Sequence, residues 1–127
     1  MKPETSAFLD KSRALFGQAN IMLEVGLTDA AGRTAYLAGL HAAQALIFER
    51  TGKIIRRHRG VQTELRRLTK DEPRFDLELR AFLGRTYNLK AIADYETGPD
   101  SEVTVEQARE ALKTAGRFLA CIEDLLA

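Results

Sequence analysis

The segment from Asp29 to Arg50 constrains the fold of this chain more than any other, because small residues fill it. They recur throughout, at Ala30, Ala31, Ala35, Ala38, Gly39, Ala42, Ala43 and Ala45. Alanine has the highest intrinsic helix propensity, and a small side chain lets a neighbouring backbone approach closely. The segment therefore predicts the central helix of a bundle, ending at Thr51-Gly52, where glycine is a common helix stop.

Apolar residues also recur at three- and four-residue steps in other parts of the chain, which is typical of helices with one buried face. The pattern predicts a helix from about Thr5 to Glu24 and a second with its buried face between Phe75 and Ala93. A shorter helix is expected over Val61–Thr69. The last long helix opens with Thr104 and Gln107, whose side chains are suited to a capping box.

No segment alternates between apolar and polar residues as a strand would. The three prolines lie outside the long apolar-periodic runs, so none interrupts a predicted helix. Four long helices, one short helix and short connections predict an all-α fold. We expect an antiparallel up-and-down four-helix bundle with one extra short helix, formed by residues 1–127 as a single domain.

Composition excludes several classes of protein. The formal net charge of +1 means that the molecule as a whole does not attract nucleic acid, although a local basic patch still could. Cys121 is the only cysteine, so no internal disulfide is possible. No apolar stretch approaches the roughly 18 residues of a membrane span, and the first residues lack the apolar core of a secretory signal. We therefore expect a cytoplasmic protein that does not enter a membrane.

The motifs of several enzyme classes are missing. There is no glycine-rich dinucleotide or phosphate loop, no His-Glu-x-x-His motif and no Gly-x-Ser-x-Gly motif. With two histidines, one cysteine and no carboxylates at metal-ligand spacing, no metal site is predicted. We expect no cofactor.

The first candidate cluster lies on the predicted central helix. Arg33, Leu37 and His41 follow one another at four-residue steps, which indicates that they share one side of the helix. His41 could be a ligand or an acid–base group. Alternatively, its imidazole is buried and accepts or donates a hydrogen bond to a neighbouring helix.

A second cluster lies near the end of the next long helix. Lys90 and Asp94 are one turn apart, Tyr95 follows directly, and Tyr87 lies one turn earlier on the same side. A cation, an anion and phenols beside a loop could bind a phosphate or another polar ligand. The same residues could instead form a salt bridge whose tyrosine holds the loop in place.

The third candidate is the basic stretch from Lys53 to Lys70. Arg56, Arg57 and Arg59 surround His58, and arginine makes bidentate contacts with phosphate. These residues are candidates to bind phosphate or RNA, although a solvated face that pairs with an acidic partner is the alternative. The stretch contains no aromatic residues, which argues against a platform for stacking single-stranded bases.

Three short motifs resemble those of a subfamily of small prokaryotic HEPN proteins. The run RTAYLAGLHAAQAL at 33–46 is similar to its "RAYYAxFHAAxAL" helix. HRGV at 58–61 is similar to the "HxGV" start of its third helix, and ADY at 93–95 to the "ADY" end of its fourth. The three motifs occur in the same order, and the resemblance covers nearly the whole chain.

This resemblance implies a bundle of four to five helices that is often a homodimer. It also implies a minimal nucleotidyltransferase as partner, in a pair of the toxin–antitoxin type. Many HEPN proteins are metal-independent RNases whose active site is an Arg-x(4–6)-His motif. This chain departs from that motif, because no histidine follows Arg85, and Lys90 stands at the aligned arginine position. A lysine does not reproduce the guanidinium fork.

We therefore expect a binding module, and not an enzyme, that recognises a nucleotide or RNA beside a nucleotidyltransferase. The expected ligand-binding residues are Arg33, Tyr36, His41, Lys90, Asp94 and Tyr95. Arg56, Arg57, His58 and Arg59 are expected to contact phosphates. One alternative is an RNase toxin that uses His41 or His58 as its acid–base group. Another is a structural helical dimer partner without a ligand.

Overall fold

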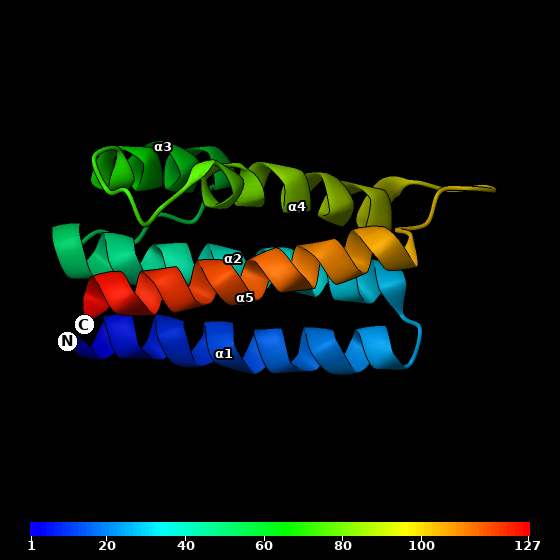
Figure 1. Cartoon of the computed structure of the whole chain (residues 1–127), viewed down its shortest axis with the longest axis horizontal. Coiled ribbons are helices and arrows are strands. Elements are labelled where there is room, and N and C mark those ends of the chain that lie inside the picture. The colour runs from blue at the N-terminus through cyan, green and yellow to red at the C-terminus, as the bar shows by residue number, and fades with distance from the viewer.

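The computed structural model describes all residues from Met1 to Ala127 and contains five α-helices and no strand. The helices are α1 (Pro3–Glu24), α2 (Thr28–Thr51), α3 (His58–Thr69), α4 (Leu77–Tyr95) and α5 (Val105–Leu126). The long helices alternate in direction, so both termini lie at the same end of the molecule (Figure 1). The prediction of an antiparallel bundle with one extra short helix is confirmed.

The helix ends follow from local chemistry. Gly52 ends α2 with a φ of 73°, in the left-handed region that glycine adopts without steric cost. At the start of α4, the Asp76 carboxylate accepts a hydrogen bond from the backbone N–H of Leu79. At the start of α5, the Thr104 and Gln107 side chains each accept from the other residue's backbone N–H. The predicted capping box is therefore present.

Helix α2 is the centre of the bundle, as its small residues predict, and it packs against all four other helices. Ala35 and Ala42 are fully buried. At Gly39 the ring of Phe82 from α4 comes so close that an added β-carbon would clash with it. Small residues on α2 therefore decide how closely α4 can approach.

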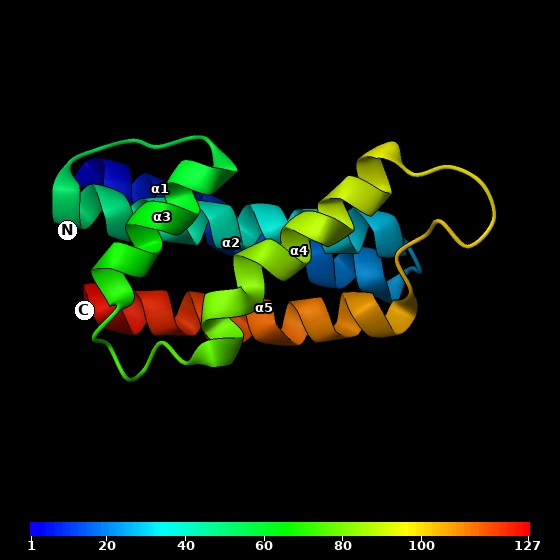
Figure 2. The ribbon, with the colours of Figure 1, turned by 90° about the horizontal axis from the view of Figure 1, so that it is seen from above.

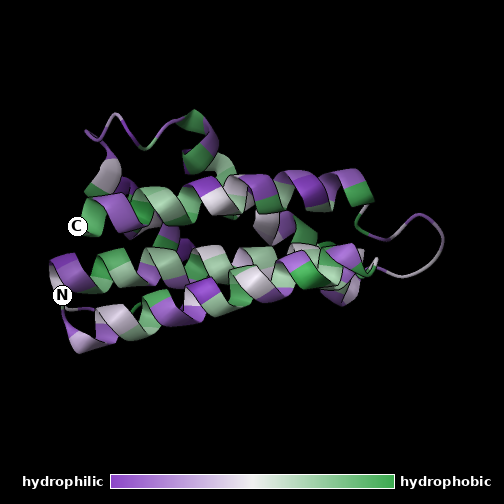
Figure 3. Ribbon diagram, turned by 60° about the horizontal axis from the view of Figure 1, so that its bottom comes forward, coloured by the Kyte–Doolittle hydropathy of each residue, from purple (hydrophilic) through white to green (hydrophobic).

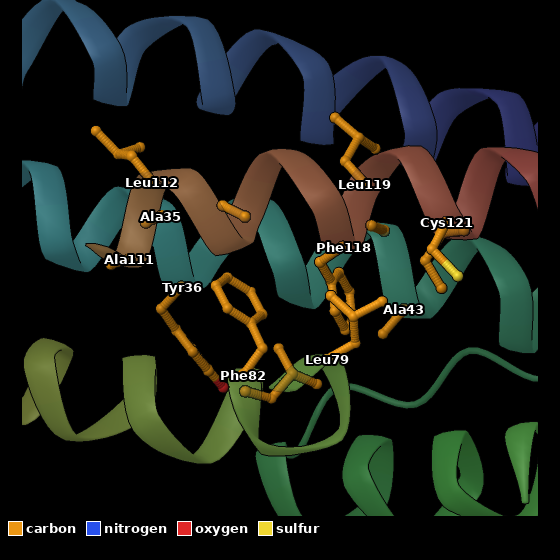
Figure 4. Packing of buried hydrophobic residues seen from close by; sticks show 14 of the residues in the cluster. Ala35, Tyr36, Ala43, Leu79, Phe82, Ala111, Leu112, Phe118, Leu119 and Cys121 are labelled. Atoms are coloured by element: carbon orange, nitrogen blue, oxygen red, sulfur yellow. The ribbon is translucent and has the colours of Figure 1, made fainter. Parts of the chain in front are cut away.

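The apolar core includes buried residues from all five helices, and its aromatic part lies between α4 and the layer formed by α2 and α5. Phe82 and Leu79 of α4 and Phe118 of α5 fill this space (Figure 4). The rings of Phe82 and Phe118 have their centroids 4.9 Å apart. Green and purple residues alternate along each helix in Figure 3, which is the pattern of amphipathic helices around one core. None of the five helices is long and apolar enough to cross a membrane.

The connection before α3 decides where the basic stretch lies. Residues 52–57 run back along α2 from its end, and α3 then crosses beside α2 (Figure 2). Val61 and Leu65 of α3 are buried. The first residue of α3, His58, is consequently held against α2 and α4, with the arginines on either side exposed to solvent.

Candidate functional site

An aromatic cluster joins three helices at the start of α3. The rings of His58 and Tyr87 are stacked, with centroids 4.0 Å apart and 15° between their planes. Tyr36 reaches from α2 toward α4 (Figure 4), and its ring meets Tyr87 edge-on at 5.5 Å. The Tyr36 hydroxyl is 2.8 Å from Nδ1 of His58. The cluster thus fixes the position and orientation of the imidazole.

Burial decides the protonation of this cluster. Desolvation raises the pKa of Tyr36 to about 12, and desolvation lowers the pKa of His58 below its usual 6.5. His58 is therefore neutral at pH 7, and the phenol is the better donor of the pair. Tyr36 donates to Nδ1, so the hydrogen of the imidazole is on Nε2. His58 presents a hydrogen-bond donor to its surroundings.

A charge cluster lies one turn further along α4. Asp94 Oδ2 is 2.8 Å from Lys90 Nζ, and Asp94 Oδ1 is 3.0 Å from Arg33 Nε on α2. The hydrogen bond from Lys90 and the charge of Arg33 lower the pKa of Asp94. The predicted pair of Lys90 and Asp94 is thus a salt bridge in this structure, and Arg33 joins it.

Two tyrosines flank this salt bridge. Lys90 Nζ lies 6.0 Å from the ring centroid of Tyr87 and 5.7 Å from that of Tyr95. Both distances suit a cation–π contact. Tyr95 is 76% exposed and Tyr87 41% exposed, although His58 covers one face of the Tyr87 ring, so only the rest of that ring is accessible to a ligand.

The three arginines around His58 are exposed, and none forms a salt bridge. Together they line a shallow hollow, whose walls are Ile54, Ile55, Arg56, Arg57, Arg59, Gly60 and Thr63. No side chain caps the first turn of α3, so its backbone N–H groups have no partner there. Further along, Arg67 differs because it is paired with Glu64. Three unpaired arginines therefore lie close together where α3 begins.

The structure brings together residues that are far apart in sequence. The basic stretch contains no aromatic residue, but α4 supplies Tyr87, which stacks on His58 between Arg57 and Arg59. The sequence pointed to Tyr87 only as a neighbour of Lys90. The sequence does not show which ring a histidine at the start of a helix will contact. That contact depends on how α3 packs against α2 and α4.

His41 does not join this cluster. It faces α1, where the ring of Phe8 lies nearly parallel to the imidazole at 6.2 Å. Nδ1 of His41 is 2.7 Å from Oε1 of Gln44. Eight residues of helix separate Arg33 from His41, and at 100° per residue this rotates them about 80° apart. The two therefore contact different helices, and the expected common side of α2 is not formed.

Tyr36 is also placed differently from the expectation. It is only 3% exposed, and its hydroxyl is already bonded to His58. Tyr36 therefore does not contact a ligand at the surface itself, but holds His58 in position there. The residues that remain open to a ligand are Arg56, Arg57, His58, Arg59, Tyr87, Arg33, Lys90 and Tyr95.

Exposed guanidinium groups suit phosphate, and exposed phenol rings suit nucleobases. No group of three or more His, Cys, Asp or Glu side chains is close enough together to hold a metal ion. The cluster as built can therefore offer positive charge, stacking faces and the Nε2–H of His58.

Comparisons with known proteins agree with this architecture. The family model of the HEPN domain matches residues 5–125. Among solved structures, the chain is similar to the protein TT1696 from Thermus thermophilus, with a TM-score of 0.81 and 21% identity. The alignment covers 97% of this chain and 98% of that one, which shows a common fold along the whole length. A search of curated proteins finds no match.

Proposed function

The chain belongs to the HEPN domain family, and from this premise we propose that it is a nucleotide- or RNA-binding module. We further propose that it works beside a minimal nucleotidyltransferase in a pair of the toxin–antitoxin type. The ligand would lie across the start of α3 and the adjoining face of α4. Its phosphates would contact Arg56, Arg57 and Arg59, and a base would stack on Tyr87 or Tyr95.

One observation carries the proposal. Three arginines without a carboxylate partner surround an imidazole that is stacked on an exposed tyrosine. Arginines that lie close together repel one another, and an anion that binds between them removes this repulsion. A ring stacked beside them offers a second, uncharged contact. Nucleotides combine these two features, a phosphate and a planar base.

Binding is favoured over cleavage because the chain lacks the Arg-x(4–6)-His motif of the RNases in this family. Metal-independent RNA hydrolysis needs groups that take up and release a proton near neutral pH. Burial lowers the pKa of His58, and Nδ1 is already engaged by Tyr36. The other histidine, His41, contacts Phe8 of α1 and Gln44, and it forms no contact with Tyr36 or Tyr87 of the aromatic cluster. RNase activity through either histidine remains the alternative that the assay must exclude.

Fluorescence anisotropy with a short, labelled, single-stranded RNA tests the proposal. With three phosphate contacts, the logarithm of the binding constant should fall with the logarithm of salt concentration at a slope of about −2. The double variant Arg57→Gln/Arg59→Gln should bind more weakly, with a slope smaller by about 1.4. Arg109→Gln removes an exposed, unpaired arginine from α5 and is the matched control. Equal effects of the two changes would contradict the proposed surface.

The stacking contact has a separate test. Tyr87→Ala should weaken RNA binding by about 1–3 kcal/mol, the usual contribution of a base stacked on an aromatic ring. Tyr87→Phe keeps the ring and should retain affinity. The same RNA, recovered after incubation and separated on a gel, shows whether it has been cleaved. Cleavage that disappears in His41→Ala or His58→Ala would replace the binding proposal by the RNase alternative.

Co-expression with the protein encoded by the adjacent gene tests the partnership. A stable complex with a small nucleotidyltransferase on size-exclusion chromatography is the expected result. Separate elution of the two proteins would reject the partnership and leave the RNA-binding proposal standing. Light scattering on the same samples gives the mass of the free protein, which should be that of a homodimer.

A further inference from the structure

His41 belongs to a second hollow, which shares Ile54 with the hollow lined by the arginines. The hollow lies between α1 and the connection that precedes α3, and its volume is about 340 Å³. We call it the His41 hollow, and it is lined by Glu4, Ala7, Phe8, Lys11, His41 and Ile54. A space of this size is at the small end of ligand-binding sites in proteins.

The walls of the hollow are held in place by one buried glutamine. Gln44 of α2 is 5% exposed, and its Nε2 donates to the carbonyl of Ile55 at 2.8 Å. Its Oε1 lies 2.7 Å from Nδ1 of His41. One side chain therefore fixes both the imidazole and the connection that carries Ile54. The site exists before any ligand arrives.

The same glutamine decides the tautomer of His41. Since Nε2 of Gln44 must donate to a carbonyl, Oε1 is the atom that faces the imidazole and can only accept. The hydrogen of a neutral His41 is consequently on Nδ1, and Nε2 carries a lone pair. Nε2 has no hydrogen-bond partner in the protein, and it is not a buried atom. A hydrogen-bond acceptor is thus available at the wall of the hollow.

The other residues complete a simple chemical pattern. Ala7, Phe8 and Ile54 provide an apolar surface, and Phe8 presents an aromatic ring beside the imidazole. Lys11 forms no salt bridge, neither with Glu4, the one carboxylate of the lining, nor with any other residue, so its charge at the edge of the hollow has no partner. A ligand that matches this pattern has a flat apolar body, an anionic group and a hydrogen-bond donor.

We propose that the His41 hollow binds a small aromatic hydroxy acid. The ring would lie on Phe8 and Ile54, the carboxylate would face Lys11, and the hydroxyl would donate to Nε2 of His41. This site adjoins the proposed RNA-binding surface, because Ile54 lines both hollows, but none of Arg56, Arg57 and Arg59 lines it and Lys11 lines only this one. Loss of one function would therefore leave the other measurable.

NMR titration of the wild-type chain with 4-hydroxybenzoate at about pH 8 tests the proposal, since imidazoles are ordinarily neutral there. Saturable shifts should appear at Phe8, Lys11, His41 and Ile54, with a dissociation constant in the millimolar range. Benzoate lacks the hydroxyl and phenol lacks the carboxylate, so each should bind about two- to fivefold more weakly.

A pair of lysine variants keeps the test independent of any effect on folding. Lys11→Gln should weaken 4-hydroxybenzoate about two- to fivefold and leave phenol unchanged. Lys113→Gln, an exposed lysine on α5 without a salt bridge, is the matched control and should change neither. Equal effects of the two variants, equal binding of the three probes, or no saturable shift at the hollow would overturn the proposal.

Discussion

At the scale of single residues, Gly39 shows how closely the bundle is packed. The ring of Phe82 occupies the space that a β-carbon at this position would need. Phe82 is almost fully buried, so its ring cannot move out of the way without disturbing its neighbours. The glycine is therefore required by contact between α2 and α4 and not by backbone conformation.

Gly39→Ala should lower the free energy of unfolding by about 1–3 kcal/mol, the usual effect of overpacking a core. Urea denaturation monitored by circular dichroism measures it. Gly17→Ala is the control, because Gly17 lies within α1 and has no heavy atom within 4 Å of an added β-carbon. Alanine should stabilise the helix there by about 0.5–1 kcal/mol. A stabilising effect at both positions would show that α4 is further from α2 than the structure has it.

His58 should make stability depend on pH. The pKa of His58 in the folded protein lies below the usual 6.5 because burial penalises the charged ring. The stabilisation that comes from burying the neutral imidazole is fully present above about pH 6.5. It is lost as the pH falls through the pKa of His58 in the folded protein. The free energy of unfolding should thus decrease between about pH 7 and 5 by more in the wild type than in His58→Gln. The imidazole proton resonances, followed by NMR over the same range, give the pKa of His58 directly; a value at or above 6.5 would contradict the burial argument.

At the scale of helices, local capping and tertiary docking have different origins. The capping box of α5 involves only Thr104 and Gln107, which are three residues apart. The stacked pair of His58 and Tyr87 involves α3 and α4, whose contact depends on how both pack against α2. The capping box could be predicted from four consecutive residues. The stacked pair could be found only from the packing of all the helices.

Thr104→Ala should lower the free energy of unfolding by about 1 kcal/mol, because the hydroxyl that accepts from the Gln107 N–H is lost. Thermal or urea denaturation measures the change. Thr63→Ala is the matched control, since the Thr63 hydroxyl bonds only to the carbonyl of Arg59 within α3. The control should change stability by less than about 0.5 kcal/mol. If both variants lost the same free energy of unfolding, the N-cap hydrogen bond of Thr104 would not stabilise the protein more than an ordinary threonine does.

At the scale of the whole molecule, the net charge is near zero, but positive charge is unevenly distributed over the surface. The formal charge is only +1, yet the arginines around His58 have no acidic partner. Elsewhere on the surface, arginines such as Arg13 and Arg117 are paired with carboxylates. Three unpaired arginines are thus gathered in the region next to the exposed tyrosines, where an anion with several negative charges is favoured.

A ligand that binds this region only in the folded state should stabilise the fold. Single-stranded RNA at about 100 times its dissociation constant should raise the free energy of unfolding by about 2.7 kcal/mol. Thermal denaturation with and without RNA measures the shift, which should shrink as salt is added. It should be reduced in Arg57→Gln/Arg59→Gln and retained in Arg109→Gln. A shift that persists in the double variant would place the RNA elsewhere.

The sequence by itself determined the helices and their order. Periodic apolar residues, the small residues of α2, Gly52 and the Thr104–Gln107 pair are local features, because helix hydrogen bonds and caps join residues only a few positions apart. The short motifs were sufficient to indicate the HEPN family. The basic character around His58 was also visible, since charge is a property of composition.

Only the tertiary structure decided which of these residues meet. It placed Tyr87 on His58, buried Tyr36 beneath them, and turned His41 toward α1, away from Arg33. These contacts depend on the rotation of each helix about its axis and on the path of residues 52–57. Rotation and path are set by the packing of many side chains at once, so spacing along a single helix could not give them.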